Sequence, residues 1–216
     1  HGASALQQIR SPLFILIALF TALQMLRINY FVATIRTQYD SLLSSPERSR
    51  RLNEFFDLAL PVGGLLAIPF IGGILDNTST PTVLAVLVSV STTIGILGCI
   101  PGSIAIGYLN VALFVLYRPF YYTAVSDYVA KVFGFQTFGK VYGLVIALAG
   151  MCNFAQAGLD ALTFKLFDRD PIPVNVALTV LVVVVGGCLV TYVSTKARAL
   201  ARSAGKIEER RSYGTV

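Results

Sequence analysis

Reactive side chains are scarce in this sequence of 216 residues. The only histidine is His1, and three cysteines, Cys99, Cys152 and Cys188, stand singly in apolar stretches without metal-ligand spacing. No G-x-S-x-G, H-E-x-x-H or phosphate-binding glycine loop is present. We therefore expect no enzymatic activity, no metal, no cofactor and no disulfide framework.

Charged residues are also few, at 13% of the chain, whereas hydrophobic residues make up 55%. A mean hydropathy of +0.72 exceeds what a soluble core of this length can bury, so lipid must be the solvent for much of the chain. The net charge of +6 does not indicate a nucleic-acid partner, because many of the basic residues lie in a tail after the last apolar run. We expect this tail, residues 196–216, to contact the headgroups of the lipid bilayer.

Six apolar runs are long enough to cross a bilayer, since a spanning helix needs about 20 apolar residues. No alternating pattern of a barrel is present, so the predicted fold class is all-α, with one six-helix bundle in residues 1–195. The predicted helices cover residues 12–37, 55–75, 81–100, 104–126, 139–167 and 173–193. Residues 38–53 are predicted to be the one long polar loop.

The distribution of basic residues favours a cytoplasmic tail. The side that holds the tail carries Arg10, Lys131, Lys140, Lys196, Arg198, Arg202, Lys206, Arg210 and Arg211. The opposite side carries Arg36, Arg48, Arg50, Arg51, Lys165 and Arg169. Both ends then lie on one side of a multi-pass protein, and the membrane is left open between plasma, vacuolar and mitochondrial.

Arg27 lies inside the first predicted helix, with Gln24 one turn away on the same face and Asn29 and Tyr30 just after it. An ionisable side chain in a span costs at least about 2.5 kcal/mol and usually faces a cavity or a partner. Gln24 and Arg27 can therefore be interpreted in two ways. In the first, they bind the carboxylate or amide of a substrate. In the second, Arg27 pairs with another helix and holds the bundle together.

Arg118 lies in the sequence YRPFYY of the fourth predicted helix, where Pro119 is expected to loosen the helix. Tyr117 and Tyr121 share one face of this helix. These residues fit a substrate site in a discontinuous helix. They also fit an arginine that reaches the membrane surface beside an interfacial tyrosine belt.

Asn153, Gln156 and Asp160 recur at i, i+3 and i+7 in the fifth predicted helix, which places them on one stripe. A polar stripe in lipid must face inward. It lines a solute path or forms hydrogen bonds with a neighbouring helix. The glycine doublets Gly63-Gly64 and Gly186-Gly187 similarly fit either close helix packing or sliding contacts in a moving bundle.

The segment from Gly72 to Asp76 after the second helix has the G-x-x-x-D pattern found in the same loop of major facilitator superfamily transporters. The basic residues that follow Asp in that motif are replaced here by NTST, so Asp76 is either part of a gating loop or a helix cap. Residues 117–122, followed by FGKVYGLVIAL at 138–148, are more specific. They resemble the tenth and eleventh helices of the L-type large neutral amino acid facilitators, and still more their fungal relatives.

This resemblance implies a transporter of large neutral amino acids or similar small organic solutes, working by alternating access without an obligatory ion. The six helices would correspond to helices seven to twelve, arranged as two inverted triplets, and their partner would be a first six-helix half. Because the sequence begins at His1 rather than methionine, we expect it to be part of a longer chain. The alternative is a complete six-helix protein that self-assembles as a channel or scaffold.

Overall fold

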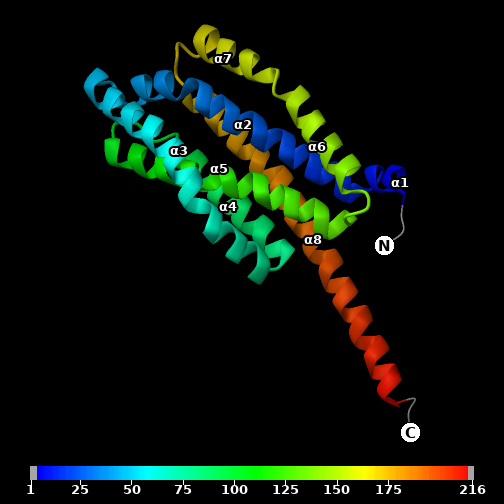
Figure 1. The fold of residues 1–216 in the computed structure, drawn as a ribbon. Coiled ribbons are helices and arrows are strands. Elements are labelled where there is room, and N and C mark those ends of the chain that lie inside the picture. Colours follow the sequence, from blue (N-terminus) through cyan, green and yellow to red (C-terminus); the bar gives the residue numbers. More distant parts are fainter. Residues whose placement is uncertain (1–3, 214–216) are drawn as a thin grey trace.

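The computed structural model describes residues 4–213, with side chains placed as far as residue 204, and its regular elements are all α-helices. A short helix, α1, is followed by seven longer ones (Figure 1). Their bounds are Ala5–Ile9 (α1), Pro12–Leu43 (α2), Pro46–Asn77 (α3), Thr80–Leu97 (α4), Ile104–Phe133 (α5), Phe138–Cys152 (α6), Ala155–Leu166 (α7) and Ile172–Tyr213 (α8). With α6 and α7 taken together, the described residues contain six spans long and apolar enough to cross a membrane. The described residues are therefore all-helical apart from their turns and loops, and their six spans fit a multi-pass membrane protein, as the sequence predicted.

Serine and proline start three of the spans. Pro12, Pro46 and Pro81 lie in the first turns of α2, α3 and α4, where a missing backbone N–H leaves no bond unmade. Each helix has a serine in extended conformation at its N-cap position. The Pro101-Gly102 turn between α4 and α5 is fixed by Gly102, whose φ is +82° and whose N–H donates to Leu42 O at 2.8 Å.

The predicted polar loop at 38–53 is wrong, because these residues are helical apart from Ser44 and Ser45. Ser44 adopts a left-handed conformation with φ of 47°, which ends α2 sharply. Each of α2 and α3 has 32 residues. At about 48 Å they outrun a hydrocarbon layer of about 30 Å. Their polar ends project beyond that layer, and Arg36 there pairs with Asp57 at 3.0 Å.

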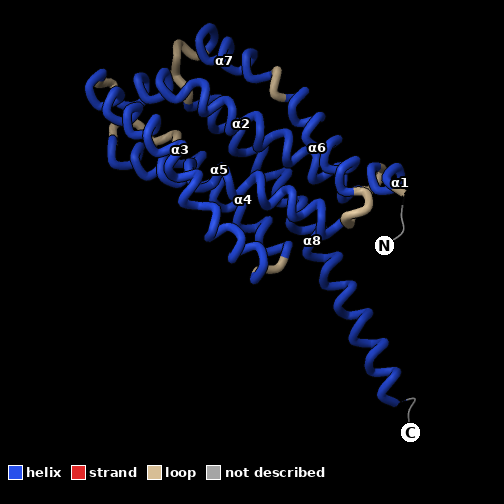
Figure 2. The backbone as a smooth tube through the Cα atoms, viewed as in Figure 1, coloured by secondary structure: helices blue, strands red, loops and turns tan. Residues whose placement is uncertain are grey.

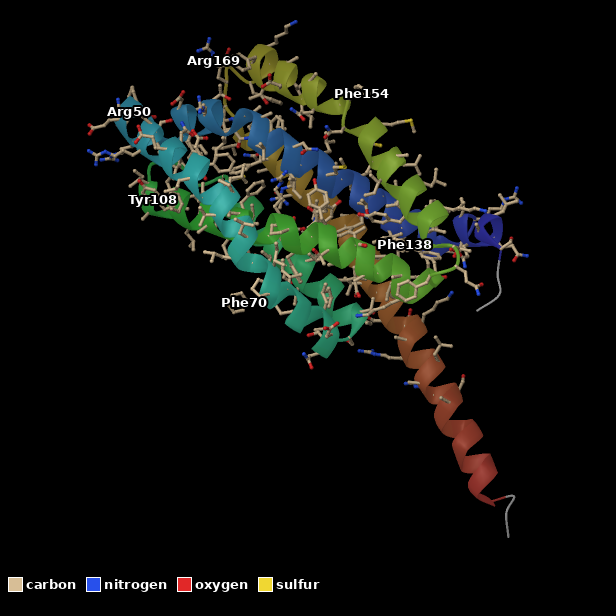
Figure 3. All side chains as sticks on the ribbon, viewed as in Figure 1. Arg50, Phe70, Tyr108, Phe138, Phe154 and Arg169 are labelled. Atoms are coloured by element: carbon tan, nitrogen blue, oxygen red, sulfur yellow. The ribbon has the colours of Figure 1, made fainter. Side chains whose placement is uncertain are left out.

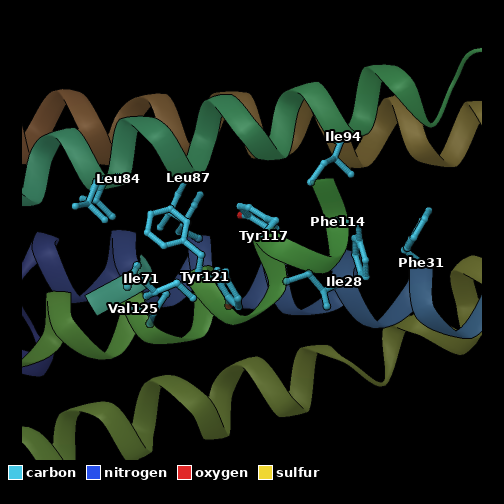
Figure 4. Packing of buried hydrophobic residues seen from close by; sticks show 14 of the residues in the cluster. Ile28, Phe31, Ile71, Leu84, Leu87, Ile94, Phe114, Tyr117, Tyr121 and Val125 are labelled. Carbon is cyan, nitrogen blue, oxygen red and sulfur yellow. The ribbon is translucent and has the colours of Figure 1, made fainter. Parts of the chain in front are cut away.

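Helix α2 forms the centre of the bundle. It packs against α3, α5, α6, α7 and α8. In its most apolar stretch of 18 residues, 56% of the residues are buried, against 17% in the corresponding stretches of α3 and of the α6–α7 span. Figure 4 shows the core between α2, α4 and α5, where Phe31 and Phe114 have ring centroids 4.4 Å apart. The central helix thus presents its polar residues to several neighbours at once.

Apart from the short turn between α6 and α7, the loops gather at the two ends of the bundle (Figure 2). The α2–α3, α4–α5 and α7–α8 connections lie at one end, and the α3–α4 and α5–α6 connections lie at the other, with α1. Helix α1, which the sequence did not predict, is joined to this second end by Gln8, whose Nε2 donates to Phe133 O at 3.0 Å.

Helix α8 does not end near residue 193 as expected. It continues to Tyr213 as a rod that leaves the bundle (Figure 1), and the side chains of residues 196–204 are exposed along it. Three basic residues of the predicted tail, Lys206, Arg210 and Arg211, lie outside the described side chains, and residues 214–216 lie outside the described chain.

Candidate solute-binding site

The fifth span is interrupted near its middle. Sequence reasoning predicted one helix over 139–167, but α6 ends at Cys152 and α7 starts at Ala155 (Figure 2). Asn153 and Phe154 form the break, and Asn153 N–H still donates to Ala149 O at 3.0 Å. Phe154 is 85% exposed and is labelled at this point in Figure 3. Phe154 N–H donates to Met151 O at 3.2 Å and Gln156 N–H donates to Asn153 O at 3.0 Å, so the break is a tight turn whose backbone stays bonded. Transporters use discontinuous helices at binding sites.

Asn153 is tied to the central helix at the break. Its Oδ1 accepts a hydrogen bond of 3.1 Å from Asn29 Nδ2. Asn29 lies close to the middle of α2, so the break faces the centre of the bundle rather than one of its ends. Of the predicted binding residues, Asn29 and Asn153 are thus brought together directly.

A cavity of about 370 Å³ lies at the break, between α2 and α7. This volume is within the range of small-molecule sites. Its lining residues are Ala33, Thr34, Asn153, Phe154, Gln156, Ala157 and Asp160. The cavity therefore contains the whole predicted polar stripe of the fifth span.

Asp160 is the one charged residue of this cavity, and sequence reasoning placed it on the stripe without including it among the binding residues. Its side chain is half-buried and forms no hydrogen bond or ion pair with the described residues. A carboxylate in a span without a cationic partner is costly unless a ligand or water meets it. The i, i+3, i+7 spacing was the signal that could have identified it as a site residue.

Tyr30 holds the far end of α7 against α2. Its hydroxyl and Thr163 Oγ1 are 2.8 Å apart and buried. This contact leaves the Tyr30 hydroxyl turned toward a neighbouring helix, beside a smaller pocket that Asp160 also borders. The structure thus gives Tyr30 a packing contact with α7 and does not place it in the lining of the cavity.

Gln24, Arg27 and Tyr117 line a different pocket, inside the bundle between α2, α4, α5 and α8. Arg27 Nη1 donates to Ser91 Oγ at 2.8 Å, and Ser91 Oγ donates to Gln24 Oε1 at 2.9 Å. This pocket shares no lining residue with the cavity at the break. The predicted binding residues therefore fall into two separate groups. Ser91 was not predicted, because a lone serine in an apolar helix gives no signal.

Arg118 and Tyr121 line neither of these two pockets. Tyr121 is buried, its hydroxyl donates to Thr21 O at 2.9 Å, and its ring stacks on Tyr117 with centroids 6.2 Å apart. The shared face of the two tyrosines is confirmed. Pro119 does not interrupt α5, so the structure does not support a discontinuous helix at this proline, and the break lies in the next span instead.

The predicted gating segment, Gly72 to Asp76, forms the exposed end of α3. Within the described residues Asp76 makes no hydrogen bond or ion pair. Its neighbour Leu75 does, through its carbonyl oxygen, which accepts from Lys131 Nζ at 2.9 Å. Lys131 also pairs with Asp127 at 2.8 Å, so α5 rather than Asp76 satisfies this helix end.

The chain is similar to Protein FMP42 of Saccharomyces cerevisiae (strain ATCC 204508 / S288c), with 48% identity over 196 residues. This similarity covers 91% of the present chain and 39% of the yeast protein. The chain thus spans less than half the length of this relative. No family model matches the chain, and no solved structure matches it.

Proposed function

We propose that this bundle is part of a membrane carrier of small organic solutes, with the solute bound at the break between α6 and α7. One observation carries the proposal: an interrupted span, a 370 Å³ cavity and a polar stripe coincide beside the middle of the central helix. A packing defect would be expected to be apolar, because unpaired polar groups in lipid are expensive.

The chemistry of the cavity suits a zwitterionic solute. Asp160 offers a carboxylate to an ammonium group, and the amides of Asn153 and Gln156 offer donors to a carboxylate. The exposed Phe154 ring offers an apolar surface for a side chain. Large neutral amino acids combine these three features, which agrees with the substrate class implied by the sequence resemblance.

The packing of the helices supports a pair of related triplets, α2–α4 and α5–α8, with α6 and α7 counted as one span. In each triplet the first helix is the most buried of the three helices and the second is the least buried. In both second helices, 17% of the residues in the most apolar stretch of 18 are buried. The second helix of each triplet packs against the first helix of the other, and α4 packs against α8. An approximate two-fold relation of this kind is expected of the inverted repeats in a major facilitator bundle.

A second six-helix bundle would complete the carrier. Helix α3 and the α6–α7 span flank α2 and α5 and leave most of their surface unburied. More than half of the yeast relative lies outside the matched region, which leaves length for such a bundle. Alternating access would then expose the cavity at the break to each side of the membrane in turn.

Uptake by vesicles containing the purified full-length protein tests this proposal. Labelled leucine or phenylalanine should enter in a saturable way, and unlabelled solute inside should accelerate the entry, as a carrier that exchanges solute does. Flux that rises linearly with concentration would instead favour the self-assembling channel, and absence of any flux would contradict the amino acid assignment.

A further inference from the structure

The pocket around Arg27 is much smaller and less open than the cavity at the break. Residues of α2, α4, α5 and α8 surround it, and it contains about 20 Å³ of free space. A space of this size holds about one water-sized particle. An amino acid does not fit there without separating the four helices.

The pocket carries a positive charge that the described residues do not balance. Arg27 is bonded to Ser91, a neutral partner, and no carboxylate lines the pocket. The four ion pairs among the described residues do not include Arg27. Ion pairing or access to water is what normally makes an arginine tolerable in a span.

Hydrogen-bond donors converge on the same space. Gln24 is fully buried and Tyr117 is 3% exposed, yet Gln24 Nε2 and the Tyr117 hydroxyl form no well-aligned hydrogen bond, although the hydroxyl lies beside Gln24 and Ser91. The nearby Ser91 hydroxyl already accepts from Arg27 and donates to Gln24. Buried donors of this kind require an acceptor, because leaving one unpaired costs about 1–3 kcal/mol.

We propose that this pocket binds one small inorganic anion of halide size, such as chloride, between Arg27, Gln24 and Tyr117. An anion accepts from all three side chains and neutralises the guanidinium. A water molecule would accept from two of these donors and donate to Asn110 Oδ1, which lines the pocket without a partner, but it would leave the guanidinium charge in place. The anion site is separate from the solute cavity and would join the central helix to α4 and α5.

Gly95 keeps the guanidinium in position. A methyl group at Gly95 would lie 2.6 Å from Arg27 Nη2 and 2.1 Å from Thr179 Oγ1, so the arginine could not stay where it is. The close approach of α4 to α2 and α8 at this glycine is therefore part of the site.

Thermal unfolding of the purified full-length protein tests the proposal when sodium chloride is exchanged for sodium gluconate at constant ionic strength. The melting temperature should rise with chloride and saturate, as expected for a ligand that binds only the folded state, and bromide should act in the same way. Arg27→Gln should abolish this dependence. Tyr117→Phe, which removes one hydroxyl, should weaken the apparent affinity about tenfold, the usual effect of losing a hydrogen bond to a charged group.

Arg118→Gln is the matched control, because it removes a guanidinium from a span without touching the pocket, and its chloride dependence should equal that of the parent protein. A melting temperature that ignores chloride, or one that responds equally in Tyr117→Phe and the parent, would overturn the proposal. A different result would also overturn it: leucine raises the melting temperature, leucinamide and chloride do not, and the effect of leucine is lost in Arg27→Gln. The pocket would then bind the carboxylate of a solute instead of an inorganic anion.

Discussion

Asn29 and Asn153 join their side-chain amides at 3.1 Å across the point where the fifth span is interrupted. The bond links the middle of α2 to the junction of α6 and α7, and the 370 Å³ cavity opens beside it. A movement of α7 relative to α2 would break or remake this contact. The contact is therefore well placed to couple solute binding to a change in the bundle.

Replacing Asn153 by alanine should impair transport more than stability. A hydrogen bond between membrane helices contributes about 0.6 kcal/mol on average, so the bundle should still fold. Solute uptake should fall severalfold, because both the break and one wall of the cavity lose their polar group. Asn77→Ala is a suitable control, since Asn77 bonds only to Gly73 O at the exposed end of α3 and should retain uptake.

The carboxylate of Asp160 should govern affinity for solutes with an ammonium group. Asp160→Asn keeps the shape of the side chain and removes its charge. A hydrogen bond to a charged group contributes about 1.5–3 kcal/mol, so the KM for leucine should rise at least tenfold. Asp168→Asn, in the exposed turn before α8, should leave the KM unchanged. Equal KM values for Asp160→Asn and the parent would remove Asp160 from the site.

The glycine doublets Gly63-Gly64 and Gly186-Gly187 should each contain one sensitive and one tolerant position. A methyl group would lie 2.1 Å from Val115 Cγ1 at Gly63 and 2.5 Å from Val88 Cγ2 at Gly186, whereas Gly64 and Gly187 have nothing within 4 Å. Gly63→Ala and Gly186→Ala should destabilise the bundle by about 1–3 kcal/mol through overpacking.

Gly64→Ala and Gly187→Ala should be neutral or stabilising by up to about 1 kcal/mol, because alanine is the better helix former. Denaturant unfolding of the four variants in detergent measures the difference. Similar effects within a doublet would contradict the close packing at Gly63 and Gly186.

Two buried tyrosines should respond oppositely to loss of their hydroxyl groups. The Tyr121 hydroxyl donates to Thr21 O, so Tyr121→Phe should lower the free energy of unfolding by about 1 kcal/mol through loss of this hydrogen bond between α5 and α2. The Tyr128 hydroxyl is buried without a partner among the described residues, so Tyr128→Phe should be neutral or stabilising. Thermal unfolding distinguishes the two, and destabilisation by Tyr128→Phe alone would contradict this assignment.

Sequence reasoning found the six spans because a run of about 20 apolar residues is what a helix needs to cross the hydrocarbon layer. It misjudged residues 38–53, because the polar ends of helices that outrun the bilayer look like a loop in composition. The left-handed Ser44 and the extended Ser45 are the only residues in 38–53 that are not helical. Hydropathy does not indicate how far a helix extends beyond the bilayer.

The candidate site was predicted only in part for a related reason. Periodicity placed Asn153, Gln156 and Asp160 on one face, and the cavity lies on that face. Helical spacing could not indicate that Gln24 and Arg27 point to α4 and not to α7, since that depends on how α2 is rotated in the bundle. The break at Asn153 contains no proline, whereas Pro119 lies in an unbroken helix, so the usual sequence signal pointed to the wrong span.

Protection of engineered cysteines by solute tests the central claim most directly. Ala33→Cys and Ala157→Cys line the cavity from α2 and α7, in a full-length protein from which Cys99, Cys152 and Cys188 have been removed. Saturating leucine or phenylalanine should slow labelling of both positions by a small thiol reagent. Labelling of Ser203→Cys, on the exposed extension of α8, should be unaffected. Unchanged labelling at both cavity positions, in protein that transports the same solute, would contradict a solute site at the break.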